Sequence, residues 1–233
     1  MSGIAIVLEN ADFSQKNIGQ VNFITDVPVE GISITGAPAT GDPEVTLGIS
    51  YTPIGTSQRG VDWAVTSGAA TINQSGVLTP NAFVDTNVVV SAVSKFNPSI
   101  YATKEVAFAY ETLSPTWTQG YYSANGDYNS PSGSRYYTIV GGIELLKDLY
   151  ISCEDGFHFR VLFYSGNPAR GTFISRTSLS TTCRISEVVP SNAKYVCFNI
   201  GHDDVLLPEE GTFFTAEELA RLNEIFPITE LSI

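Results

Sequence analysis

The stretch Val-Asp-Trp-Ala-Val-Thr-Ser at residues 61–67 places Val61, Trp63 and Val65 on one side of an extended chain. Side chains of a β-strand alternate between its two faces, so this pattern predicts a strand with one buried face. Further short alternating segments precede and follow it, separated by Gly, Pro and Asn at intervals of roughly 8–12 residues. Such spacing predicts an antiparallel β-sandwich over residues 26–111.

The expected strands of this first sandwich share alternation and a turn residue near one end. They cover residues 31–36, 45–53, 61–67, 70–73, 77–80, 87–94 and 104–110. The order Gly31-Ile-Ser-Ile-Thr-Gly36, Leu47…Tyr51-Thr-Pro53, Val61-Asp-Trp-Ala-Val-Thr-Ser-Gly68, Ala70-Thr-Ile-Asn73 and Val88-Val-Val-Ser-Ala92 resembles the bacterial Ig-like domain, group 2. The resemblance implies that Trp63 is the central core residue. It also implies a displaying or adhesive role rather than an enzyme.

Residues 112–200 form a second β-rich segment, in which residues 157–164 are expected to form a strand. The two faces of this expected strand are Phe157, Phe159, Val161 and Phe163 on one side, and His158, Arg160, Leu162 and Tyr164 on the other. The segment resembles a small jelly-roll module of tailed-phage structural proteins. The matching residues are Trp117 and Gly120, then Ser132 or Ser134 with Arg135, Val161 and Tyr164, and finally Pro190, Ala193, Lys194, Tyr195 and Val196. Modules of this kind also resemble carbohydrate-binding sandwiches.

Two shorter segments flank the expected sandwiches. Residues 1–25 contain one apolar stretch, Ile4 to Leu8, and are too few to form a core, so we expect them to act as an anchoring arm. Residues 201–233 form an acidic tail with one basic and eight acidic residues. Thr215-Ala-Glu-Glu218 is a capping box that predicts a helix of about 12 residues, which Pro227 ends. An amphipathic helix this short needs a partner surface.

Composition excludes several classes of function. The 233 residues have a net charge of −12, which argues against a nucleic-acid partner. They contain no run of about 18 apolar residues, so no membrane insertion is expected. The three cysteines, without the basic start of a signal peptide, predict free thiols in a chain that folds in a cytoplasm. We expect Cys153, Cys183 and Cys197 to be small buried residues at strand positions.

No constellation for chemistry is evident, so we predict no catalytic residue, no metal and no cofactor. The only histidines are His158, on a strand beside Arg160, and His202. His202-Asp203-Asp204 lacks a second His or Cys at ligand spacing. Its acidic neighbours Glu209 and Glu210 follow no calcium-ligand spacing, and a solvated acidic loop is the favoured interpretation.

The residues that stand out are aromatic and basic. Trp117, Tyr121, Tyr122 and Tyr136 are candidates for a ligand or interface patch, because aromatic faces stack on sugar rings and anchor interfaces. The alternative is that these side chains fill the second core. The same segment carries four arginines. We expect them either to pair with the acidic tail, to pair with another subunit, or to form a solvated face. They are Arg160, Arg170, Arg176 and Arg184.

Together these patterns predict an all-β protein: an Ig-like sandwich, a jelly-roll-like sandwich and a short C-terminal α-helix. We expect a non-enzymatic virion structural protein of a tailed phage, made in the host cytoplasm and displayed on the particle surface as a head fibre or capsid decoration protein. It would dock on other virion proteins through residues 1–25 and form a homo-oligomer, a dimer or trimer. The alternative is a carbohydrate- or receptor-binding module whose partner is a host-surface glycan.

Overall fold

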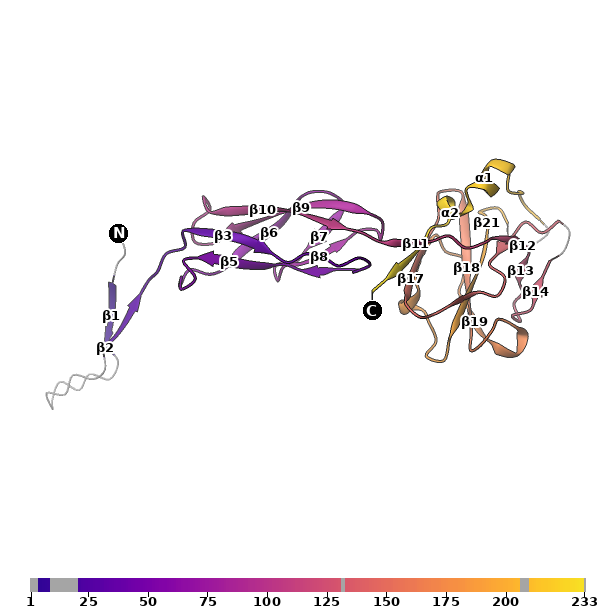
Figure 1. The fold of residues 1–233 in the computed structure, drawn as a ribbon, viewed down its shortest axis with the longest axis horizontal. Coiled ribbons are helices and arrows are strands. Elements are labelled where there is room, and N and C mark those ends of the chain that lie inside the picture. Colours follow the sequence, from indigo (N-terminus) through magenta and orange to yellow (C-terminus); the bar gives the residue numbers. More distant parts are fainter. Residues whose placement is uncertain (1–3, 9–20, 131–132, 206–209, 233) are drawn as a thin grey trace. The chain divides into compact units, whose positions relative to one another are not determined.

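The computed structural model describes residues 4–8, 21–130, 133–205 and 210–232. The chain forms two compact units, the first from residues 1–39 and 43–108 and the second from residues 40–42 and 109–233 (Figure 1). Antiparallel sheets dominate both, and helix is confined to short segments. The predicted all-β, sandwich-like fold is therefore confirmed. None of the helices in the described part of the chain has the length and apolar character needed to cross a membrane.

The first strands of the chain form a hairpin. β1 (Ile4–Leu8) pairs antiparallel with β2 (Val21–Thr25), with Ile4 opposite Thr25 and Leu8 opposite Val21. Both strands fall in the expected anchoring arm, whose residues 9–20 lie outside the described residues. β2 mixes apolar residues with Asn22 and Thr25, and the sequence analysis did not predict it as a strand.

Three sheets make up the rest of the first unit. Their strands are β3 (Gly31–Thr35) with β5 (Gly48–Thr52); β4 (Val45–Thr46), β8 (Val77–Pro80) and β7 (Ala70–Ile72); and β10 (Tyr101–Phe108), β9 (Thr86–Ser94) and β6 (Val61–Ser67). The alternation expected from the sequence is visible in β9, where Val88, Val90 and Ala92 are fully buried.

Trp63 occupies the core position predicted for it and is 7% exposed. The side chain of Gln74 holds its backbone on both sides, accepting from Trp63 N and donating to Trp63 O, each at 3.1 Å. Gly76 lies under the indole with φ +85°, and a Cβ there would meet Leu47 O at 2.5 Å. The hairpin turn therefore requires glycine, because a side chain would collide with the backbone beside the tryptophan.

The second unit contains two larger sheets. One has the order β11 (Glu111–Leu113), β22 (Ile228–Leu231), β17 (Asp148–Ser152) and β20 (Thr182–Arg184). The other has the order β12 (Thr118–Gln119), β15 (Tyr137–Thr138), β21 (Tyr195–His202), β18 (Phe157–Tyr164) and β19 (Phe173–Arg176), with β16 (Ile143–Glu144) also paired to β21. A separate hairpin joins β13 (Tyr121–Tyr122) to β14 (Tyr128–Asn129), and η1 (Arg170–Thr172) and η2 (Ile185–Glu187) are 3₁₀ turns.

The main core of the second unit draws on both large sheets. Phe157, Phe159, Val161 and Phe163 of β18 contribute to it, as the alternation predicted. Ile151 of β17 and Ile228 of β22 face the same cluster from the other sheet. The opposite side of β18 is also buried, since Leu162 and Tyr164 pack with Tyr122 and Cys197. Both faces of β18 are thus covered, which explains why so little of this strand reaches solvent.

The C-terminal segment differs from the expected tail. The predicted capping box is confirmed, with Thr215 and Glu218 bonded reciprocally. The expected single helix is wrong: α1 (Ala216–Ala220) and α2 (Leu222–Ile225) are separated at Arg221, whose N–H bonds back only to Glu218 O. After Pro227 the chain continues as β22 between β11 and β17. The segment completes the second unit, because its apolar side chains cover that unit's own core.

Candidate functional site

The most distinctive region of the second unit is one largely buried face of the β18–β21 pair, which we call the tyrosine face. Cross-strand neighbours point to the same side, so the face combines His158, Arg160, Leu162 and Tyr164 of β18 with Tyr195, Cys197, Asn199 and Gly201 of β21. Arg160 lies directly opposite Asn199. Unlike the other side of β18, this face carries polar and charged groups in its middle.

Asn199 attaches the hairpin β13–β14 to this face. Its Oδ1 accepts from Tyr122 N at 2.9 Å, and its Nδ2 donates to Tyr122 O at 2.8 Å. Asn199 is 4% exposed, so both bonds are shielded from water. Sequence reasoning missed this residue, although one polar side chain inside the apolar strand Tyr195–Ile200 was a usable clue.

We expect Asn199→Ala to destabilise the second unit by about 2–4 kcal/mol, because Tyr122 N and Tyr122 O would both lose their partner in a place shielded from water. Thermal unfolding at pH 7 measures the change. The matched control is Asn192→Ala at an exposed position, which should alter stability little. Equal melting temperatures for the two variants would show that the Asn199 bonds do not hold the hairpin.

Tyr136 lies over the other end of the tyrosine face. Its hydroxyl donates to Val205 O at 2.6 Å, and a Cβ on Gly201 would meet its ring at 3.0 Å. The ring stands edge-on to His158 at 6.0 Å and 6.3 Å from the ring of Tyr121. Gly201 thus provides the space for the tyrosine. Burial raises the pKa of Tyr136, although the nearby arginines Arg160 and Arg176 oppose the rise.

The four predicted aromatic residues do not form one exposed patch. Tyr122 and Tyr136 are buried, at 2% and 5% exposure, whereas Trp117 and Tyr121 are half-buried. The Trp117 indole packs 6.0 Å from Phe226 and donates to Asn223 Oδ1 at 2.8 Å. Tyr121 and Tyr136 meet at one end of the tyrosine face, and Tyr122 packs against its Leu162 and Tyr164, while Trp117 packs against the main core.

The four arginines of the second unit have different surroundings. Arg184 donates to Asp148 Oδ2 at 2.7 Å, and Arg170 lies 3.9 Å from Asp127 in an exposed pair. Arg160 and Arg176 have no carboxylate within ion-pair distance among the described residues. None of the four therefore pairs with the described part of residues 201–233.

The two histidines occupy separate positions. His158 is 4% exposed, with Nδ1 3.7 Å from Asp203 Oδ1 and Nε2 without a hydrogen-bond partner in the described structure. Burial lowers the pKa of His158, and the carboxylate of Asp203 opposes that fall. His202 Nε2 lies 3.4 Å from Glu218 Oε2. Across the described residues, no group of three or more His, Cys, Asp and Glu side chains could hold a metal ion; Glu209 lies outside them.

The three cysteines are free, with Cys197 buried and Cys153 and Cys183 half-buried. Burial raises the pKa of the Cys153 and Cys197 thiols to about 12 and that of Cys183 to about 11. Cys183 and Cys197 lie on strands as expected, whereas Cys153 follows β17. The thiols are therefore protonated at neutral pH.

We expect the native chain to react slowly with a disulfide reagent such as DTNB at pH 8, because the thiolate is the reactive species. Adding denaturant should expose three fast-reacting thiols. The release of thionitrobenzoate measures both rates. A rapid reaction of any thiol in the folded chain would contradict the burial of these side chains.

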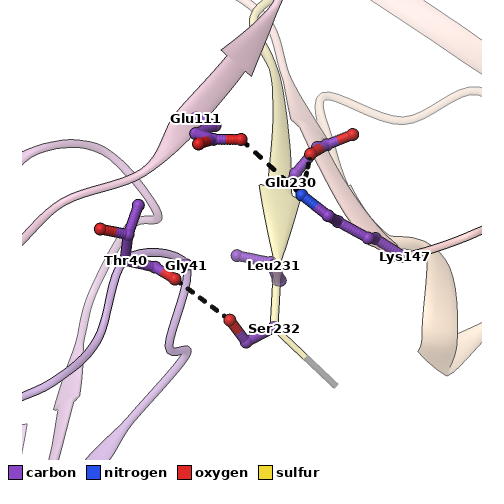
Figure 2. Close-up of a pocket in the computed structure, with 7 residues that line it drawn as sticks. All are labelled: Thr40, Gly41, Glu111, Lys147, Glu230, Leu231 and Ser232. Atoms are coloured by element: carbon purple, nitrogen blue, oxygen red, sulfur yellow. Dashed lines mark hydrogen bonds and ion pairs between the residues drawn. The ribbon is translucent and has the colours of Figure 1, made fainter.

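A hollow of about 360 Å³ lies elsewhere in the second unit (Figure 2). Its lining residues are Thr40, Gly41, Glu111, Lys147, Glu230, Leu231 and Ser232. Lys147 bonds to Glu230 and lies 3.7 Å from Glu111, and hydrogen bonding to Glu230 raises the pKa of the amine. Ser232 N donates to Gly41 O at 2.8 Å. Since the charge of Lys147 is balanced by its two neighbours, the tyrosine face is the stronger candidate for binding.

Comparison with known proteins finds no family model and no curated protein that matches this chain. The fold places the chain among all-β proteins built from two antiparallel units. The site is a buried aromatic and basic sheet face in the second of them.

Proposed function

We infer that this chain is a non-enzymatic structural protein of a tailed-phage particle, displayed on its surface as a head fibre or capsid decoration protein. The observation that carries the proposal is the β1–β2 hairpin, because an isolated two-stranded hairpin is marginally stable in water and needs a further surface. Docking of residues 1–25 on other virion proteins, or on copies of the same chain, would supply that surface.

Two resemblances support this assignment. The strand order of residues 31–94 is similar to the group 2 bacterial Ig-like domain, and residues 117–196 are similar to a jelly-roll module of tailed-phage structural proteins. Display modules of both kinds are all-β, as the two units are. A phage particle is assembled in the host cytoplasm, where three free thiols remain reduced.

Immuno-electron microscopy tests the placement. An antiserum raised against the purified chain is expected to label the surface of tailed particles in lysates of cells that produce it. Label restricted to cell envelopes, or to soluble protein, would contradict a virion role. Pre-adsorption of the antiserum with the purified chain controls for unrelated antibodies.

The mass of the chain in solution tests the role of the arm. We expect the full chain to form a dimer or trimer and a chain that begins at Asp26 to be a monomer with unchanged thermal unfolding of both units. If the full chain and the shortened chain are both monomers, assembly through residues 1–25 is contradicted.

A second candidate function is a carbohydrate- or receptor-binding module. The observation that favours it is the tyrosine face, where Tyr121 and Tyr136 lie 6.3 Å apart beside an arginine without a carboxylate partner among the described residues. Aromatic rings of this kind stack on sugars, and arginine supplies directed hydrogen bonds. Glycan-array binding by the full chain tests this function independently of particle labelling.

A further inference from the structure

We propose that Arg160, with Arg176 and the half-buried ring of Tyr121 beside the buried Tyr136, forms a binding site for the carboxylate of an acidic sugar. This inference rests on the binding function above and names its ligand class. It starts from the side chain of Arg160, which lies in the middle of the tyrosine face, opposite Asn199 on the neighbouring strand.

Arg160 is half-buried, and one of its donors has no acceptor in the described structure. Its Nε is shielded from solvent and has no hydrogen-bond partner in the described structure. No carboxylate of the described residues lies within ion-pair distance of it. A shielded donor on a cation is costly when it is unpaired, so we expect an acceptor from beyond the described residues, and the proposal assigns that acceptor to a ligand.

A second arginine increases the positive charge at the same place. Arg176 of β19 lies opposite Leu162, which is two residues from Arg160 on the same side of β18. The two arginines are therefore diagonal neighbours on one face. Burial lowers the pKa of Arg160, and the charge of Arg176 lowers it further. An anion between them would relieve this repulsion and use the fork of N–H donors.

The residues around Arg160 indicate which class of anion would fit the site. The hairpin strand that carries Tyr121 is held to Asn199, directly across from Arg160, and the ring of Tyr121 lies beside Tyr136. A guanidinium binds a planar carboxylate through two parallel hydrogen bonds, and aromatic rings contact the apolar face of a sugar. His158, whose Nε2 has no partner in the described structure, lies in the same row of side chains and adds a polar group. Together these features fit a uronic or sialic acid residue.

The test uses the full chain and titration calorimetry with oligogalacturonate, polysialic acid and chondroitin sulfate, each beside a neutral counterpart. Methyl-esterified oligogalacturonate is the sharpest counterpart, because it differs only at the carboxyl group. We expect at least one acidic glycan to bind, its neutral counterpart to bind at least about tenfold more weakly, and Arg160→Gln to lose about tenfold or more. Arg176→Gln should lose less, because its side chain is more exposed.

Arg170→Gln is the matched control, since it removes the same charge from an exposed position of the same unit. Equal binding of acid and ester, or equal losses in R160Q and R170Q, would overturn the proposal, as would the absence of binding to every acidic glycan. Binding of neutral glycans without binding of any acidic glycan would overturn the proposal of an acidic-sugar site but would leave the carbohydrate-binding function intact. The virion role is tested separately, by labelling of particles with the antiserum.

A second readout separates binding from a structural role. If Arg160 is kept for a ligand, Arg160→Met should leave the melting temperature of the free chain unchanged or raise it, because a methionine buries no unpaired donor. Arg184→Met should lower it by several degrees, roughly 2–8 °C, since Arg184 satisfies buried Asp148. A drop for R160M as large as that for R184M would assign Arg160 to the fold and overturn the proposal.

Discussion

Phe226→Ala is expected to lower the free energy of unfolding of the second unit by about 3–5 kcal/mol. The ring is fully buried and lies 6.0 Å from Trp117, 5.6 Å from Phe157 and 6.2 Å from Phe214. Truncation to alanine removes these contacts and leaves a cavity that the surrounding rings fill only in part. The effect would be large because the residue comes from the C-terminal segment yet lies inside the main core.

Phe213→Ala provides the matched control in the same segment. Phe213 is 48% exposed, and its ring lies 3.1 Å from the Arg135 guanidinium carbon. Its loss should cost about 1 kcal/mol or less. Urea unfolding measures both, with Trp117 as the reporter in a Trp63→Phe background, since the two units need not unfold together. Similar values for F226A and F213A would contradict the inclusion of the C-terminal segment in the core.

Asp148→Ala is expected to be similarly severe, at about 3–5 kcal/mol. The carboxylate is 8% exposed. It accepts from Arg184 Nε at 2.7 Å, from Ser186 N at 2.8 Å and from Ser186 Oγ at 2.7 Å. Removing it takes the Asp148 carboxylate away from the Arg184 guanidinium and from the start of η2. The exposed Asp155→Ala is the control and should change stability little.

The same group predicts a pH dependence. Burial alone would raise the pKa of Asp148, but hydrogen bonds from Arg184 and Ser186 outweigh it and lower that pKa below its ordinary value. A carboxyl with a depressed pKa stabilises the fold above its unfolded pKa of about 4, and this stability is lost as pH falls through the folded pKa. Urea titrations from pH 6 to pH 2 should therefore show a smaller acid loss in D148A than in D155A. Parallel curves would contradict the network.

Local sequence patterns were enough for the class of fold and for much of its interior. Alternation put Trp63 on the buried face of its strand and correctly divided the faces of residues 157–164. The pair Thr215 and Glu218 marked a helix start, because a cap depends on neighbours only three residues apart. These features depend on chain geometry that operates over a few residues, so the sequence alone determined them.

Only the tertiary structure decided which distant residues meet. Periodicity indicates that a face is apolar but not what covers it. The C-terminal helix was expected to need a partner surface, and Phe226, which follows it, packs on Trp117 and Phe157 of the same unit. The pairing of Asn199 with Tyr122 spans 77 positions, and no local pattern encodes it. The unpaired Nε of Arg160 likewise became visible only in the folded chain, where it has no acceptor among the described residues, since a partner is a property of three-dimensional neighbours rather than of spacing along the chain.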